Sequence, residues 1–189
     1  MLSRTRRLAE AAHTNGVRLM IDAEQTYFQP AIDHVVLQLQ REFNKEDPII
    51  FNTYQCYLKD SRARMLLSLR RSQEEGWKLG FKAVRGAYMV QESKRAREIG
   101  YDCPINDTIE HTHVTYDSVV ESALRANSKG TGTEVMIASH NEDSIVAAVR
   151  LIGELGIDKA SGGVYFGQLL GMRDSVSFGL GAAGYNVFK

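Results

Sequence analysis

Polar and ionisable side chains follow short apolar runs at five places in this chain. Each run has the length of a buried strand, and the residues after it could bind a charged or hydrogen-bonding ligand. The five places are Met20–Glu24, Phe51–Gln55, Lys82–Tyr88, Met136–Asn141 and Val164–Gln168. Strands that repeatedly end in such residues, with helices between them, are typical of enzymes built on a β/α barrel.

Lys82 and Arg85 are the two cations of the third strand ending. Strand alternation places Lys82 on one face and Arg85 on the other, so one of them faces the interior of a barrel. A buried charge requires a partner, because an isolated charge in the interior costs several kcal/mol. Asp22 is the natural partner for Lys82. The pair has two interpretations, a functional one and a structural ion pair at the mouth of the barrel.

Two dipeptides at strand ends could bind a ligand. Gly86 would let backbone N–H groups approach an anion while Arg85 binds it with two hydrogen bonds. His140 and Asn141 place a donor and an acceptor side by side, and functional and structural interpretations are about equally supported for them. The remaining histidines have no such context, and we assign structural roles to His13, His34, His111 and His113, the last two in an expected loop. No carboxylate and histidine set has ligand spacing, so we expect no metal.

Helical periodicity in the segments between these runs predicts the elements that position them. The predicted strands are Val17–Asp22, Ile49–Gln55, Leu79–Val84, Glu134–Ser139 and Val164–Phe166. The predicted helices are Ser3–His13, Ile32–Phe43, Arg62–Glu75, Gln91–Ile99, Tyr116–Ala126 and Ile145–Leu155. Strands that alternate with helices in this way lie parallel, with the helices outside.

Three further segments have weaker signals. The range 100–113 is the longest irregular stretch and reads as a surface connection or a functional loop. Gly179–Gly184 fits G-x-G-x-x-G, but no acidic residue follows at the right distance, so we interpret it as a glycine-rich connection. Tyr185–Lys189 predicts the start of a sixth strand. Five strands and a stub do not close an eight-stranded barrel, so we expect one partial barrel domain over residues 1–189, with an open five-stranded sheet as the alternative.

Composition narrows the class of protein. Lys and Arg number 23 and so do Asp and Glu, so no net charge favours nucleic acid as a partner. No apolar run reaches the ~20 residues of a spanning helix. The two cysteines, Cys56 and Cys103, do not form a disulfide framework, and a reducing compartment is the default expectation.

Five blocks together resemble the proline dehydrogenase family, which are flavoenzymes on a (β/α)8 barrel. The blocks follow the order and spacing of the family over almost the whole chain: Ile21–Glu24, Phe51–Asp60, Val84–Tyr88, Ala138–Asn141 and Leu169–Met172. The residue pattern of the second block resembles the eukaryotic, mitochondrial branch of the family more than the bacterial branch.

The resemblance implies FAD over the carboxyl ends of the strands and L-proline as the substrate. It implies a catalytic set of Asp22, Lys82, Tyr88 and Leu169, with Lys82 near the flavin N5 edge and the other three lining the amino-acid pocket. It implies a cofactor set of Gln55, Lys82, Arg85, Gly86, His140 and Asn141. The implied reaction yields 1-pyrroline-5-carboxylate, with a quinone as acceptor, on the matrix side of the mitochondrial inner membrane and with peripheral membrane association.

The family pattern also contains a final Tyr-x-Pro-x-Gly strand and a helix with two arginines that bind the substrate carboxylate. Neither occurs in these 189 residues, and the opening strands of the barrel are also missing. We therefore expect the chain alone not to turn over proline. Three alternatives remain open: hydroxyproline dehydrogenase, methylenetetrahydrofolate reductase, which these blocks do not resemble, and a non-catalytic fragment.

Overall fold

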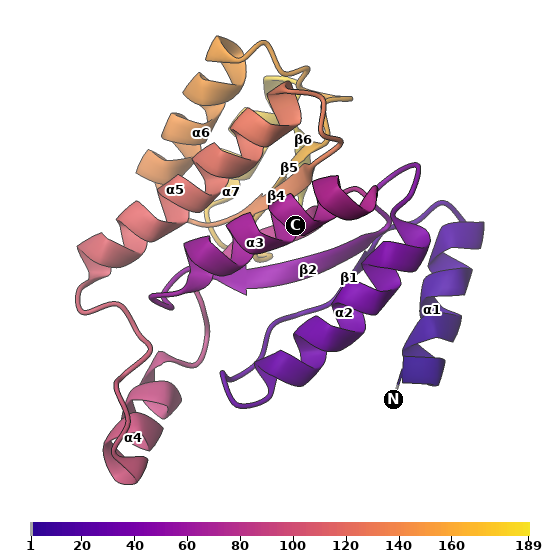
Figure 1. Ribbon diagram of the computed structural model, residues 1–189. Coiled ribbons are helices and arrows are strands. Elements are labelled where there is room, and N and C mark those ends of the chain that lie inside the picture. The colour runs from indigo at the N-terminus through magenta and orange to yellow at the C-terminus, as the bar shows by residue number, and fades with distance from the viewer. Residues whose placement is uncertain (1) are drawn as a thin grey trace.

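The computed structural model describes residues 2–189, and it contains one parallel sheet of six strands in the order β1-β2-β3-β4-β5-β6 (Figure 1). The strands are β1 (Leu19–Met20), β2 (Ile50–Gln55), β3 (Gly80–Val84), β4 (Glu134–Ala138), β5 (Val164–Gly167) and β6 (Asn186–Phe188). Each strand pairs with the next one along the chain, as in a barrel and unlike in a doubly wound sheet. The predicted partial barrel and its sixth strand are confirmed.

Seven helices connect or precede the strands. They are α1 (Leu2–Thr14), α2 (Gln29–Phe43), α3 (Ser61–Glu75), α4 (Met89–Ile99), α5 (Ile109–Ser128), α6 (Glu142–Glu154) and α7 (Asp174–Ala182). Several of their ends have local causes in the sequence. A proline in the first turn starts α2, a left-handed Gly76 ends α3, and the Asn141 side chain caps α6.

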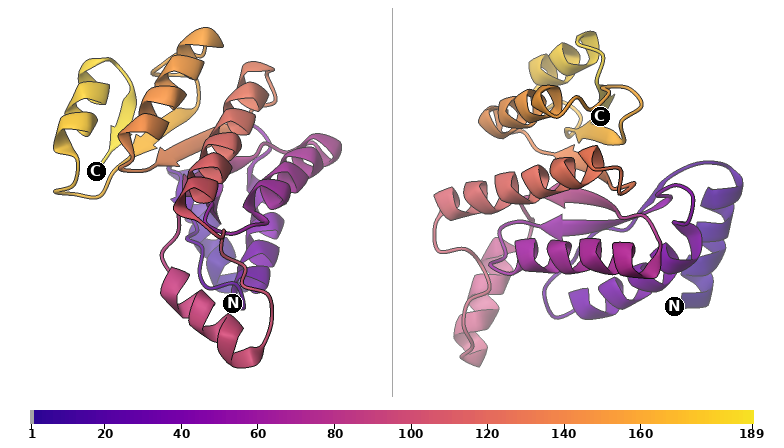
Figure 2. Two further views of the ribbon diagram at one scale, coloured as in Figure 1. Left: turned by 90° about the vertical axis from the view of Figure 1, so that its left-hand side faces the viewer. Right: turned by 45° about the horizontal axis from the view of Figure 1, so that its top comes forward.

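The sheet curls so that its helices lie on the outer face, while α4 projects away from the other helices (Figures 1 and 2). All six residues of β2 are buried, as expected for a strand covered on both faces. The main core lies between the outer face of the sheet and the helices, and Phe81, Ile137 and Phe166 are fully buried there.

A smaller apolar cluster of Phe51, Met136 and Tyr165 occupies the inner face of the sheet. Near its amino-terminal edge, Arg18 bonds Glu134 with Nε and Nη2 at 3.1 and 2.9 Å. The Arg18 guanidinium also lies 4.6 Å from the centre of the Tyr165 ring. These contacts link the segment before β1 to β4 and β5 across the inside of the curled sheet.

Two predictions about the connecting segments were wrong. The helix expected from Tyr116 begins at Ile109, so the irregular stretch is shorter, and His111 and His113, expected in a loop, both lie on a helix. Thr108 starts α5 by accepting a hydrogen bond from the His111 amide at 3.2 Å. The glycine-rich range 179–184 lies mostly within α7, because burial of Leu180 on that helix outweighs the poor helix propensity of glycine.

Candidate functional site

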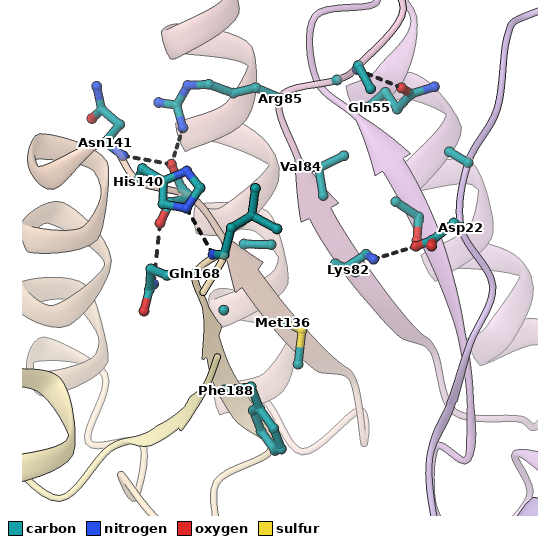
Figure 3. A pocket seen from close by; sticks show the side chains of 18 of the residues that line it. Asp22, Gln55, Lys82, Val84, Arg85, Met136, His140, Asn141, Gln168 and Phe188 are labelled. Atoms are coloured by element: carbon teal, nitrogen blue, oxygen red, sulfur yellow. Dashed lines mark hydrogen bonds and ion pairs between the residues drawn. The ribbon is translucent and has the colours of Figure 1, made fainter. Parts of the chain in front are cut away.

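A pocket of about 670 Å³ lies at the carboxyl ends of the strands, on the inner face of the sheet (Figure 3). Its wall includes all nine residues that the sequence identified as site candidates. They are Asp22, Gln55, Lys82, Arg85, Gly86, Tyr88, His140, Asn141 and Leu169. They come from five different strand ends and meet because parallel strands present their carboxyl ends at one edge.

Lys82 faces the pocket, so it is the inward-facing one of the two cations that strand alternation separated. Its Nζ lies 2.5 Å from Asp22 Oδ1 (Figure 3), and the two side chains are 20% and 74% exposed. The register places Lys82 beside Thr53 on β2 and Met136 on β4. The ammonium group is therefore fixed low in the pocket, while the Asp22 carboxylate stands at its rim.

Gln55 is almost fully buried and joins two loops at the pocket. Its Nε2 donates to the Glu24 carbonyl at 2.8 Å, and its Oε1 accepts from the Ala87 amide at 3.3 Å. The neighbouring Glu24 side chain raises the pKa of the Tyr88 hydroxyl above its ordinary value. The loops after β1 and β3 therefore form one continuous wall. Glu24 was not among the predicted site residues.

His140 contacts the loop after β5. Its Nε2 accepts a hydrogen bond from the Leu169 amide at 2.9 Å, so this nitrogen carries no proton in the observed arrangement (Figure 3). The Leu169 side chain is 66% exposed at the pocket rim. Lys189 supports the same loop by donating to the Leu169 and Met172 carbonyls at 3.3 and 2.6 Å.

Arg85 extends to the outer side of the sheet, where three groups bind its guanidinium. It donates to Ser139 Oγ at 2.5 Å and Ser144 Oγ at 2.9 Å, and its Nε lies 3.3 Å from His113 Nδ1. It also stacks over the Tyr116 ring at 4.3 Å. No sequence pattern indicated this network, because its members come from four separate elements.

Gly86 and Asn141 each have a structural role besides their place in the pocket wall. Gly86 has φ +135°, and the Tyr57 ring packs against it so closely that a Cβ would lie 1.5 Å from a ring carbon. Asn141 caps α6 through Oδ1, which accepts from the Ser144 amide at 2.9 Å. The pocket therefore uses these two residues for shape as well as for any ligand contact.

Three further pocket residues were missing from the predicted set, and two of them, Ser139 and Gln168, lie at the carboxyl ends of the predicted strands. The Ser139 hydroxyl binds Arg85, and the Gln168 side-chain amide donates to the Ser139 carbonyl at 3.3 Å. Met136 contributes apolar surface between them and Lys82 (Figure 3). The position of Ser139 and Gln168 at strand ends was the available signal. Within residues 2–189 no group of three His, Cys, Asp or Glu side chains could hold a metal.

Fold and pocket together define a β/α-barrel protein whose binding site is built from the loops after its strands. The family profile described as proline dehydrogenase matches residues 2–189, and the chain belongs to the proline dehydrogenase family. The resemblance seen in the sequence is thus confirmed. Within residues 2–189 no helix is both long and apolar enough to cross a membrane.

Curated relatives and solved structures agree with this assignment. The chain is 53% identical over 189 residues to proline dehydrogenase 1, mitochondrial, of Homo sapiens, covering 100% of this chain and 32% of the relative. It is 45% identical to hydroxyproline dehydrogenase of Xenopus laevis, covering 98% of this chain and 40% of the relative. The chain thus spans about a third of the length of the first of these relatives.

The structure of proline utilization A from Bdellovibrio bacteriovorus, inactivated by N-propargylglycine, superposes with a TM-score of 0.89. Its sequence is 22% identical, and the match covers 98% of this chain and 19% of that one. At this identity the similarity establishes the shared fold.

Proposed function

We propose that this chain forms the flavin- and substrate-binding part of an enzyme that oxidises L-proline to 1-pyrroline-5-carboxylate in proline catabolism. The observation that carries the proposal is the Lys82 ammonium, which Asp22 holds on the inner face of a pocket lined by all nine site residues that the resemblance implied. Family membership supplies the substrate class.

The pocket residues fit FAD. For the isoalloxazine ring, Val84 and Met136 offer apolar surface, and Gln55 and Lys82 offer polar groups. For the pyrophosphate, the cation Arg85 lies next to Ser144 in the first turn of α6, and a helix amino terminus attracts anions. The nearby Tyr116 hydroxyl is buried without a hydrogen-bond partner among the described residues.

FAD, when bound, supplies the hydride acceptor for the reaction. Lys82 would favour transfer because its fixed positive charge stabilises the negative charge that develops on the ring. Tyr88 and Leu169 would hold the substrate ring with C5, the carbon next to the nitrogen, over that acceptor. The amine of proline must be unprotonated when it reacts to form the imine. Asp22 would hold the cationic groups of the pocket in place.

The names of the relatives support a mitochondrial location, and the acceptor is proposed from the family resemblance. We infer that electrons pass to a quinone and that the protein acts in mitochondria, on the matrix side of the inner membrane with peripheral association. Hydroxyproline is the second candidate substrate, because one relative is named hydroxyproline dehydrogenase. Rates with proline and 4-hydroxyproline, measured on a full-length version, distinguish the two.

The test compares Lys82→Ala with Lys94→Ala, a control on the exposed face of α4. Titration of FAD into the purified chain should quench flavin fluorescence with both variants. In a full-length version, stopped-flow bleaching of the flavin by proline should slow at least tenfold in Lys82→Ala only, as about 1.4 kcal/mol of charge stabilisation implies. Failure of the unaltered chain to bind FAD, or equal bleaching rates in both variants, would contradict the proposal.

A further inference from the structure

Glu92 is a fully buried carboxylate that the proposed reaction does not use. It lies on α4, the helix that projects from the rest of the fold (Figures 1 and 2). Only Glu92 and Ala96 are buried on this helix. A buried carboxylate is costly unless it is paired or hydrogen-bonded, so the contacts of Glu92 indicate what it does.

Both carboxylate oxygens of Glu92 bind Thr26, in the loop between β1 and α2. One oxygen accepts from the Thr26 amide at 2.6 Å, and the other accepts from the Thr26 hydroxyl at 2.7 Å. Because hydrogen bonds to a charged group are roughly twice as strong as neutral ones, this residue pair is the main attachment between the loop and the helix.

The neighbouring residues extend this contact along α4. The Gln25 side-chain amide donates to the side-chain carbonyl oxygen of Gln91 at 2.9 Å. The Arg95 guanidinium lies 4.3 Å from the centre of the Tyr27 ring. Three consecutive loop residues therefore face one side of α4, with the Glu92 contact in the middle.

The two joined segments carry adjacent parts of the pocket wall. The loop holds Asp22 and Glu24, and Tyr88 directly precedes α4. The Glu92 amide donates to the Tyr88 carbonyl at 2.9 Å, which connects the carboxylate to the Tyr88 backbone. A shift of Thr26 away from Glu92 would separate Glu24 from Tyr88.

We propose that Glu92 is a positioning residue, which, by holding Thr26, sets the spacing between the Asp22–Glu24 wall and Tyr88. For the chain itself this means that the Glu24–Tyr88 contact depends on Glu92. That the same spacing controls substrate affinity rests on the proposed function. The two consequences are tested separately.

The first test uses the purified 189-residue chain and the ionisation of Tyr88. Glu24 is the largest cause of the raised pKa of this phenol, with burial and then Asp22 adding to it, so the pKa reports whether the loop is in place. Each variant is titrated by tyrosinate absorbance against its own Tyr88→Phe counterpart, and circular dichroism confirms that both remain folded. Glu92→Ala should lower the pKa of Tyr88 towards the ordinary value for tyrosine.

Three further variants separate positioning from general destabilisation. Glu98→Ala removes an exposed carboxylate from the same helix and should leave the pKa of Tyr88 unchanged. Glu92→Gln should keep most of the raised pKa of Tyr88. The side-chain amide of glutamine can accept a hydrogen bond from the Thr26 backbone N–H and donate one to the Thr26 hydroxyl. Thr26→Val, which removes only the hydroxyl, gives a partial decrease and serves as the test if Glu92→Ala does not fold.

The second test measures proline oxidation in a full-length version. Glu92→Ala should raise KM for proline roughly tenfold, since a hydrogen bond to a buried charge is worth about a decade in an equilibrium constant, and should leave the FAD affinity unchanged. An unchanged pKa of Tyr88 in folded Glu92→Ala and Thr26→Val would overturn the positioning role. If the unaltered protein does not oxidise proline, the proposed function fails, and the Tyr88 titration still decides the role of Glu92.

Discussion

Replacing Gly86 by alanine would force a methyl group into the ring of Tyr57. An ideal Cβ at Gly86 would lie 1.5 and 1.6 Å from two ring carbons, far inside any van der Waals contact. The Tyr57 ring cannot retreat easily, because the residue is 1% exposed within the core. The backbone at Gly86 also has φ +135°, which side-chain-bearing residues rarely adopt.

Two costs therefore add. Overpacking a filled core typically costs about 1–3 kcal/mol. The unfavourable backbone conformation costs a further ~1–3 kcal/mol. The sum, about 2–6 kcal/mol, is a large share of the ~5–15 kcal/mol that stabilises a typical domain. Gly130 is a matched control, because it has φ +73° and a Cβ added there would meet no atom within 4 Å, so Gly130→Ala incurs only the backbone cost, about 1–2 kcal/mol.

Urea unfolding of the chain, followed by circular dichroism, measures both variants. The decisive comparison is Gly86→Ala in a Tyr57→Ala background, where the ring is gone and only the backbone cost remains. We expect a coupling free energy of at least ~1 kcal/mol between the two positions. If Gly86→Ala destabilises equally with and without the ring, or no more than Gly130→Ala, the steric reasoning is wrong.

Three further predictions concern stability. Arg18→Met should lower the free energy of unfolding by about 1–2 kcal/mol in urea titrations, because it leaves the largely shielded Glu134 carboxylate without its cation and with the Tyr165 hydroxyl as its remaining donor. Asn141→Ala should cost about 1 kcal/mol through loss of the α6 cap, seen as a lower urea midpoint with unchanged m. Hydrogen bonding to Arg41 lowers the pKa of Glu75 to about 2, so this carboxylate stabilises the fold above its unfolded pKa and loses that effect as pH falls from about 4.5 to about 2. Glu75→Gln should flatten the acid limb of stability over that range, and an unchanged limb would show that solvent screens the pair.

The sequence alone determined the features that depend on local periodicity. Alternation within β3 places Lys82 and Arg85 on opposite faces of the sheet, since successive side chains in a strand point to opposite faces, so one of the two cations had to face inward. The same reasoning identified Asp22 as the partner of Lys82, and the two atoms lie 2.5 Å apart. Polar residues at strand ends identified the pocket, because parallel strands bring those ends to one edge.

The tertiary structure decided what depends on packing between distant segments. The sequence could not show that Arg85 is bound by Ser139, which follows β4, and by residues of α5 and α6. It also could not show that Glu92 is buried against Thr26, 66 positions away. From the sequence we expected Gly86 to let an anion approach the backbone, whereas in the structure the Tyr57 ring packs against Gly86. Burial of Leu180 stabilises a helix in a glycine-rich segment that the sequence predicted to be a connection. Local patterns assign the face on which a side chain lies. Its partners depend on how distant segments pack, and the periodicity of the sequence carries no information about that packing.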